Sequence, residues 1–287
     1  MATTVAEPGG GLSAPEIQGP GSAAGDSLLQ PAPGPAFFAI VLPMMKRGYL
    51  VVDIETVPDG ALYQPPEVKL GEERPFPPLF AHRPIVIGAL LLDDNYRFQK
   101  LNVFRGESEA ELLRGFATYV DEKRPNLITY NGRSFDLPVI ALRCLRHGIP
   151  LRFYYDDRDY RHRYSEAGHF DLCDFLAEHG ATRPMGLDAM ARLIGLPGKI
   201  GVDGSQVEGL YNAGQLEAIR DYCLADVAQT AFLLLRVRLL QGLLSVDNYR
   251  QMATDLLAAC ANDGRLKLLV ERADRQRLLL APGPPTP

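Results

Sequence analysis

Apolar positions in the first half of the chain gather in short β-branched runs, whereas in the second half they recur at helical spacing. Residues 49–54 (YLVVDI) form a continuous apolar run typical of a buried strand. Residues 85–92 and 96–104 have the same character, and Asp93-Asp94-Asn95 between them indicates a hairpin turn. The chain is therefore expected to begin its folded part with three strands.

Helix signals follow the hairpin. Ser108 and Glu111 have capping-box spacing and open an amphipathic segment. Residues 127–130 predict a short strand, and the next helix has Pro138 in its first turn and Gly148 just past its end. Further helical patterns cover residues 172–179, 186–194 and 216–240. This order predicts an α/β fold with a mixed central sheet flanked by helices.

The two ends of the chain differ in composition from the middle. Residues 1–36 are dominated by Ala, Gly, Pro and Ser without a hydrophobic period, and we expect a flexible tail that reaches residue 47. Residues 281–287 have the same composition and predict a second disordered tail. One domain is expected between them, at residues 48–280, within the 287-residue chain.

Composition limits the classes of protein. The four cysteines are far apart and form no CxxC pair, so neither a zinc site nor a disulfide framework is expected, and a cytoplasmic location fits best. No apolar run is long enough to span a bilayer, so no membrane partner is expected. The net charge of −5 gives no positive field for nucleic acid, although bound cations would cancel the charge of a metal-binding acidic cluster.

Two carboxylates end the first strand. Asp53 and Glu55 are two residues apart, and side chains at that spacing on a strand project from the same face. Like charges so close repel each other unless a cation lies between them. The alternative is an exposed acidic strand end that leads into a turn.

Three further positions could complete this cluster. Asp136 lies between a strand and a helix, where it could cap the helix, face a metal ion, or do both. Tyr222 and Asp226 are four residues apart and share one helix face. An ordinary amphipathic helix, with a packed tyrosine and a solvated aspartate, would give the same spacing.

The combination of these signals resembles a known enzyme superfamily. Asp-x-Glu on a first strand, Asn-x3-Phe-Asp after a later strand and Tyr-x3-Asp on a late helix are similar, in this order, to the three exonuclease motifs of the DEDD superfamily, in the subclass whose third motif carries Tyr. The segments RPIVIGALLLD, LITYNGRSFDLPVI, HFDLCDFL, GLDAMARLIGLPGK and GVDGSQVEGLY…IRDYCLADV look like the predicted 3'→5' exonuclease family related to the proofreading domain of family B DNA polymerases. The resemblance covers roughly residues 49–240.

The resemblance implies a ribonuclease H-like fold, two divalent metal ions and hydrolysis of phosphodiester bonds at the 3' end of single-stranded nucleic acid, with DNA favoured over RNA. Asp53 would bridge both ions, Glu55 and Asp226 would hold the ion that carries the attacking water, Asp136 would reach the second, and Tyr222 would orient the water. Mg²⁺ or Mn²⁺ suits a carboxylate cluster, and no sulfur ligand is expected in it.

Weaker candidates surround this cluster. Substrate contacts are expected from Thr56, Asn131, Phe135, His169 and Lys199, although packing is an equal role for Phe135 and a structural role is open for His169. Residues 153–164 alternate basic and aromatic side chains, as suits a single strand, or form a solvated loop. The alternatives for the whole chain are an exoribonuclease, an oligonucleotide-degrading enzyme on the same fold, or a non-catalytic nucleic-acid-binding subunit; the sequence identifies no protein partner.

Overall fold

The computed structural model describes residues 47–67, 75–201 and 204–281. Its sheet has five strands in the order β3-β2-β1-β4-β5. The first three strands along the chain are antiparallel neighbours, and β4 and β5 run parallel to β1. The strands are β1 (Tyr49–Pro58), β2 (His82–Leu92), β3 (Phe98–Val103), β4 (Asn126–Thr129) and β5 (His169–Asp171).

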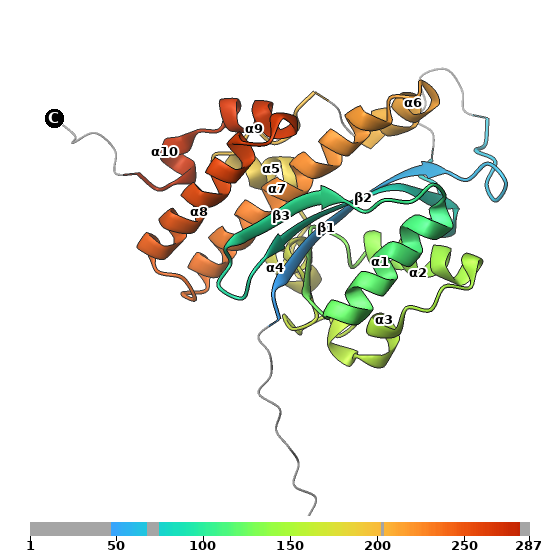
Figure 1. Ribbon diagram of the computed structural model, residues 1–287, viewed down its shortest axis with the longest axis horizontal. Coiled ribbons are helices and arrows are strands. Elements are labelled where there is room, and N and C mark those ends of the chain that lie inside the picture. Colours follow the sequence, from blue (N-terminus) through green and yellow to red (C-terminus); the bar gives the residue numbers. More distant parts are fainter. Residues whose placement is uncertain (1–46, 68–74, 202–203, 282–287) are drawn as a thin grey trace, which may run out of the picture. The chain divides into compact units, whose positions relative to one another are not determined.

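Helices lie on both sides of this sheet. Figure 1 shows α1 to α3 on one side and α7 to α10 on the other. The helices are α1 (Glu109–Lys123), α2 (Asp136–His147), α3 (Arg152–Asp156), α4 (Leu172–Leu176), α5 (Leu187–Leu193), α6 (Val207–Asn212), α7 (Leu216–Leu240), α8 (Val246–Ala261), α9 (Lys267–Arg272) and α10 (Arg275–Leu278). This arrangement confirms the predicted α/β fold with a mixed sheet flanked by helices, in the ribonuclease H-like order.

The two faces of β1 belong to different cores because side chains alternate along a strand. Leu50 and Val52 pack in the core formed with α1 and α2. Val51 packs in the core around α7, α8 and α5, and Val57 packs in a smaller cluster with the beginning of α7. Asp53 has the parity of Val51 and Val57 and therefore projects from the face that α7 covers.

Most predicted elements are present. The hairpin between β2 and β3 is confirmed, and Ser108 caps α1 by accepting a hydrogen bond from the Glu111 backbone N–H at 3.3 Å. Gly148 ends α2 with a left-handed φ of 62°. The predicted first strand ended at residue 54, whereas β1 continues to Pro58. Strand β5 was not predicted.

The predicted tails at residues 1–47 and 281–287 lie outside the described residues except at their inner ends, Arg47 and Ala281. No described helix is both long and apolar enough to cross a membrane. All four cysteines are buried and free, and each lies in a different helix: Cys144 in α2, Cys173 in α4, Cys223 in α7 and Cys260 in α8.

Candidate active site

The site is built first on the middle of β1, which carries Asp53 and Glu55. Asp53 is partly exposed and Glu55 is buried, with 8% of its surface accessible. The register between β1 and β2 shifts immediately after Glu55, between Glu55 and Thr56. Bulges of this kind re-aim side chains and are common beside active sites. The two carboxylates therefore point to the same side just before the strand changes direction.

Asp136 reaches the same region from the first turn of α2. It is the first residue of the helix and only 4% exposed, and the N-cap position belongs to Phe135, whose side chain makes no capping bond. Of the roles that the sequence left open for Asp136, it therefore does not take that of the N-cap residue. The pKa of Asp136 is raised to about 7 by desolvation and by the charge of Asp171, while backbone hydrogen bonds from Asp136 and Ile54 oppose the rise.

The loop before α2 is held in place by Asp171, at the end of the neighbouring strand. Its carboxylate accepts hydrogen bonds from the backbone N–H of Asn131 at 2.9 Å and of Arg133 at 2.7 Å. Asn131 has a left-handed φ of 67°, and a Cβ on Gly132 would lie 2.5 Å from Thr129 Cβ. Only glycine fits there, so the backbone turns tightly between β4 and Asp136.

Helix α7 supplies the remaining predicted residues. Tyr222 and Asp226 lie one turn apart, and the Tyr222 hydroxyl donates a hydrogen bond to Asp226. Gln229, which is buried, also donates to Asp226 Oδ1 at 3.2 Å, and its Oε1 accepts from the Gly198 backbone N–H at 2.9 Å. Gln229 thus connects Asp226 to the loop that carries Lys199. Desolvation raises the pKa of Asp226, and the charge of Lys199 partly opposes this rise.

Charge repulsion shows that the acids meet in one place. The pKa of Asp53 is raised well above its ordinary value by desolvation and then by the charges of Asp136, Glu55 and Asp226. The pKa of Glu55 is likewise raised by desolvation, Asp226 and Asp136. Desolvation raises the pKa of Asp226 to about 6. Desolvation and the neighbouring acids also raise the pKa of the Tyr222 hydroxyl.

The structure adds Cys223 to this cluster, which the sequence did not indicate. Its thiol donates to the backbone oxygen and to Oδ2 of Asp53, both at 3.5 Å. Candidate ligand atoms of Asp53, Glu55 and Cys223 all lie within 4.8 Å of one another. A sulfur atom therefore lies beside the carboxylates, although the sequence predicted oxygen ligands only. The thiol is fully buried and its pKa is raised well above the ordinary value, first by desolvation and then by Asp53.

Thr56 and Phe135 both contact the ring of His82. The Thr56 hydroxyl and His82 Nδ1 are 2.9 Å apart, and His82 Nε2 lies 3.0 Å from the Pro77 carbonyl oxygen. A carbonyl only accepts, so Nε2 carries the proton and Nδ1 accepts from Thr56. The His82 ring packs against Phe135 and Phe76, with centroids 4.9 and 4.6 Å away. Thr56, Phe76 and His82 line a pocket of about 480 Å³.

The structure separates His169 from the other predicted substrate contacts. Asn131 is exposed beside the cluster, and Lys199 is exposed near Asp226. His169 is fully buried in β5, and its Nε2 lies 2.8 Å from the Thr129 hydroxyl. Desolvation lowers the pKa of His169 to about 3. It therefore has no surface to offer a substrate, and the structural role fits it.

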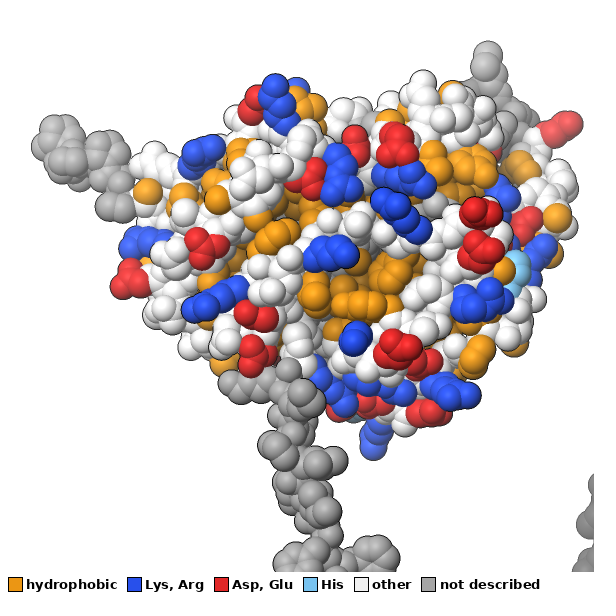
Figure 2. Space-filling view, in the orientation of Figure 1, with side chains coloured by type: hydrophobic (Ala, Val, Ile, Leu, Met, Phe, Trp, Pro, Cys, Tyr) orange, Lys and Arg blue, Asp and Glu red, His pale blue; other side chains and the backbone are white. Residues whose placement is uncertain are grey.

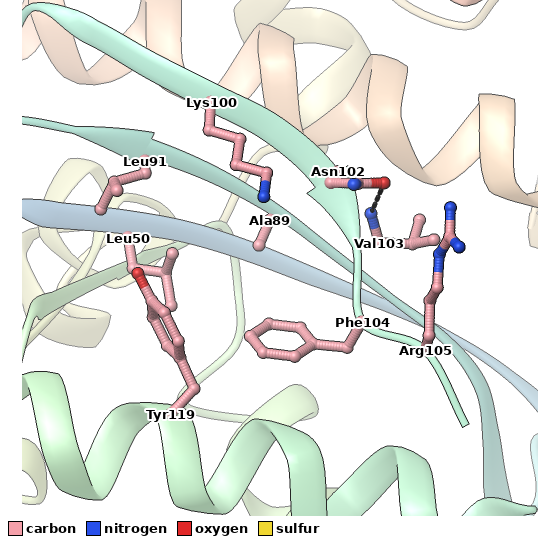
Figure 3. Close-up of a pocket in the computed structure, with 9 residues that line it drawn as sticks. All are labelled: Leu50, Ala89, Leu91, Lys100, Asn102, Val103, Phe104, Arg105 and Tyr119. Atoms are coloured by element: carbon pink, nitrogen blue, oxygen red, sulfur yellow. Dashed lines mark hydrogen bonds between the residues drawn. The ribbon is translucent and has the colours of Figure 1, made fainter.

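A second pocket lies on the opposite face of the sheet. Figure 2 shows apolar side chains gathered in a hollow beside α1, and Figure 3 shows Leu50, Ala89 and Tyr119 pointing into this space. Leu50 and Asp53 are three residues apart on one strand and so face opposite sides. The pocket measures about 250 Å³, and no carboxylate is among its lining residues. It is therefore separate from the acidic cluster.

Solved structures with a similar arrangement include polymerases and exonucleases. The family B DNA polymerase of the archaeon Pyrobaculum calidifontis matches 77% of this chain at 21% identity, with a TM-score of 0.48. A zinc-bound complex of E. coli exonuclease I with single-stranded DNA and a complex with a dA16 oligonucleotide each match 78% at 15% identity, with TM-scores of 0.37 and 0.38. The matches span 29% of the polymerase chain and 45% of each exonuclease chain.

Sequence comparisons identify the protein family of this chain. No curated protein matches the chain significantly. The family model described as predicted 3'-5' exonuclease related to the exonuclease domain of PolB matches residues 74–270, more than half of the sequence. The matched range begins after Asp53 and Glu55 and includes Asp136, Tyr222 and Asp226. The chain therefore belongs to the family of predicted 3'-5' exonucleases related to the exonuclease domain of PolB.

Proposed function

We propose that the protein removes nucleotides from the 3' end of single-stranded DNA, as an exonuclease of the DEDD superfamily in the subclass with a tyrosine in its third motif. One observation carries this proposal. Besides desolvation, the charges of Asp136 and Asp226 raise the pKa of both Asp53 and Glu55, so carboxylates from β1, α2 and α7 lie close together. A folded protein keeps such repulsion where a ligand of opposite charge relieves it.

The donor set fits two divalent cations. Asp53, Glu55, Asp136 and Asp226 offer oxygen ligands of the kind that Mg²⁺ and Mn²⁺ prefer. The Cys223 thiol is protonated and donates a hydrogen bond to Asp53. It therefore orients this carboxylate, and all proposed metal ligands are oxygen atoms. When bound, two such cations supply an activated water and neutralise the charge that builds up on a phosphodiester during cleavage.

The chain's own residues orient what enters the cluster. The Tyr222 hydroxyl lies beside Asp226 and donates a hydrogen bond, so it can direct a water held near that carboxylate. Its raised pKa makes it a donor and a poor base. Gln229 fixes the second side of Asp226 through Oδ1. Asp226 is thus held from two sides before any substrate binds.

The pocket lined by Thr56, Phe76 and His82 suits an unpaired nucleotide of the bound strand. Phe76 offers a largely exposed aromatic face there, and Thr56 offers a hydroxyl group that can still accept a hydrogen bond. Stacking on such faces binds any base, because every base has a π surface. The pocket therefore favours an unpaired strand without demanding a particular sequence.

Labelled oligonucleotides test the proposal. Purified protein is incubated with 5'-labelled and 3'-labelled single strands of DNA and RNA, with Mg²⁺, Mn²⁺ or EDTA. We expect a ladder from the 5' label, release of mononucleotide from the 3' label, faster cleavage of DNA, and no cleavage in EDTA.

Matched variants assign that activity to the cluster. Asp53→Ala should abolish cleavage, because it removes a proposed metal ligand. The protein should stay folded, because the change also removes one of the carboxylates that repel one another. Asp247→Ala removes an exposed carboxylate on α8 and should cleave at the parent rate. Turnover by a folded Asp53→Ala protein near the parent rate would refute the assignment.

A further inference from the structure

A basic and aromatic surface continues from the loop that carries Asp136. In this loop, the Arg133 guanidinium donates to the backbone oxygen of Arg161 at 3.1 Å and to that of His169 at 3.2 Å. Arg133 therefore joins the loop between β4 and α2 to the segment at residues 152–164. This segment is the one in which the sequence alternates arginine and tyrosine.

Two tyrosines of this segment hold their rings in solvent. Tyr155 is 56% exposed and Tyr164 is 67% exposed. The Arg161 guanidinium lies over the Tyr155 ring, 5.1 Å from its centroid. The Tyr164 ring meets the ring of His179 edge-on at 4.9 Å, which fixes its orientation. Large aromatic side chains this exposed are costly to leave in water and are typical of binding surfaces.

Local ion pairs decide which charges remain available on this surface. Arg163 pairs with Asp174 at 2.6 Å, and Arg47 pairs with Asp157 at 3.2 Å. Among the described residues, no carboxylate forms an ion pair with Arg161. Its charge is therefore left to a ligand, beside the exposed Tyr155 ring.

We propose that Arg133, Tyr155, Arg161 and Tyr164, here called the arginine–tyrosine surface, bind the part of the strand that lies to the 5' side of its last few nucleotides. Guanidinium groups contact phosphates and aromatic rings stack on bases, and both act without regard to sequence. This surface adjoins the loop that leads to Asp136, and this gives the direction of the bound strand. Its 3' end lies in the carboxylate cluster, and the rest of the strand runs past Asn131. This inference rests on the proposed function, because it extends the same substrate.

Binding measured without cleavage tests the surface. Fluorescence anisotropy in EDTA follows 5'-labelled single strands of 4 and 16 nucleotides. Tyr155→Ala and Arg161→Gln should each weaken binding of the 16-mer about tenfold, the order expected for one lost stacked base or phosphate contact. Binding of the 4-mer should stay unchanged. Arg161→Gln should also flatten the salt dependence of the 16-mer Kd, since fewer counterions are released.

Controls separate stacking from folding. Tyr155→Phe keeps the aromatic face and should bind the 16-mer like the parent, and Arg114→Gln removes an exposed charge from α1 and should do the same. If Tyr155→Ala and Arg161→Gln bind the 16-mer as tightly as the parent, the proposed surface is wrong. It is also wrong if the parent binds the 4-mer and the 16-mer with equal affinity. Lack of cleavage by a parent that still shows this length dependence would instead refute the proposed exonuclease activity.

Discussion

At the scale of single residues, the site depends on side chains whose directions are fixed by their neighbours. Asp226 is held by Tyr222 and Gln229 on its own helix. Asp136 is placed by a loop whose backbone N–H groups are bound by Asp171. Pre-organised groups of this kind lose little freedom when a ligand arrives. The supporting residues are therefore as much a part of the site as the acids.

Tyr222→Phe tests whether the hydroxyl acts in the reaction. This change keeps the ring and its packing and removes one hydrogen bond to Asp226. A positioned hydrogen-bonding group is worth about 10²–10⁴ in rate when it transfers a proton, and a purely orienting one should fall near or below 10². We expect kcat to fall by up to about 10² with an unchanged metal optimum, measured on one oligonucleotide. An unaltered kcat would make Tyr222 a packing residue only.

Local spacing explains which site residues could be predicted. Asp53 with Glu55 and Tyr222 with Asp226 are pairs within one element, so strand and helix geometry place each pair together. Cys223 could not be assigned in this way, because its position depends on how closely α7 approaches β2. The burial of His169 depends in turn on β5, a strand of only three residues.

At the scale of elements, the contact between α7 and β2 sets the depth of the site. Gly88 of β2 pairs with Asp53 of β1, and a Cβ on Gly88 would lie 2.7 Å from Cys223 Sγ and 3.1 Å from Val227 Cγ2. The absence of a side chain at this position lets α7 bring Tyr222 and Asp226 close to Asp53.

Gly88→Ala should therefore weaken both folding and activity. The added methyl group forces α7 and β2 apart, and overpacking of this kind costs about 1–3 kcal/mol of unfolding free energy. The cost should be smaller when Cys223→Ala is also present, because that change removes the sulfur that the methyl group meets. Urea unfolding of the two single variants and of the double variant measures the coupling free energy between the two substitutions. Additive effects would mean that the two residues do not compete for this space.

A buried ion-pair network connects the turn after β1 to α1 and α2. The Arg143 side chain is 1% exposed and lies 2.8 Å from Asp59 Oδ2 and 2.5 Å from Glu109 Oε1. It also donates to the Phe80 carbonyl at 3.2 Å. These bonds tie the end of the strand that carries Asp53 to the helix that begins with Asp136.

Arg143→Ala should be among the more damaging single changes outside the site. It removes the buried cation between Asp59 and Glu109, which keep only the more exposed Arg146 and His147 as partners. Breaking a buried pair typically costs about 3–5 kcal/mol. Lys267→Ala breaks a solvent-exposed pair with Glu271 and should cost at most about 1 kcal/mol. Denaturant unfolding measures both. A loss as small for Arg143→Ala as for Lys267→Ala would mean that the network contributes no more than a surface pair.

The elements show where sequence patterns stop being informative. The strands β1 to β4 and the helices α1, α2 and α7 have the apolar period or the caps that predict them. Strand β5 has no such period, since it is short and carries a buried histidine and aspartate whose partners come from the end of β4 and the loop after it. The helices α8 to α10 were not predicted, because no helical pattern was assigned after residue 240.

At the scale of the whole molecule, the carboxylate cluster links folding to pH and to cations. The folded-state pKa values of Asp136 and Asp226 are raised to about 7 and about 6. Between about pH 4 and pH 7 the folded protein therefore holds protons that the unfolded chain has released, and this contribution falls as the pH rises. The pKa of His169 is lowered and contributes with the opposite sign.

Asp136→Asn isolates the contribution of the cluster. In EDTA, variant and parent should be similarly stable near pH 4–5, where the parent carboxyl is protonated, and the variant should become the more stable one as the pH rises to about 8. Added Mn²⁺ should stabilise the parent and not the variant. Urea unfolding across this pH range gives the difference, and the histidine contribution cancels between the two proteins. A difference independent of pH would contradict the raised pKa of Asp136.

The four buried cysteines have a consequence for chemical labelling. Burial raises the pKa of Cys144 and Cys260 to about 12 and that of Cys173 to about 11, and it also raises the pKa of Cys223 well above the ordinary value. Thiol reagents attack thiolates, so the native chain should react only when a helix opens. Mass spectrometry of a slow labelling reaction would then report the opening of α2, α4, α7 and α8 separately, with no engineered reporter. A single cysteine added to the surface would accept a dye selectively while all four native thiols stay in place.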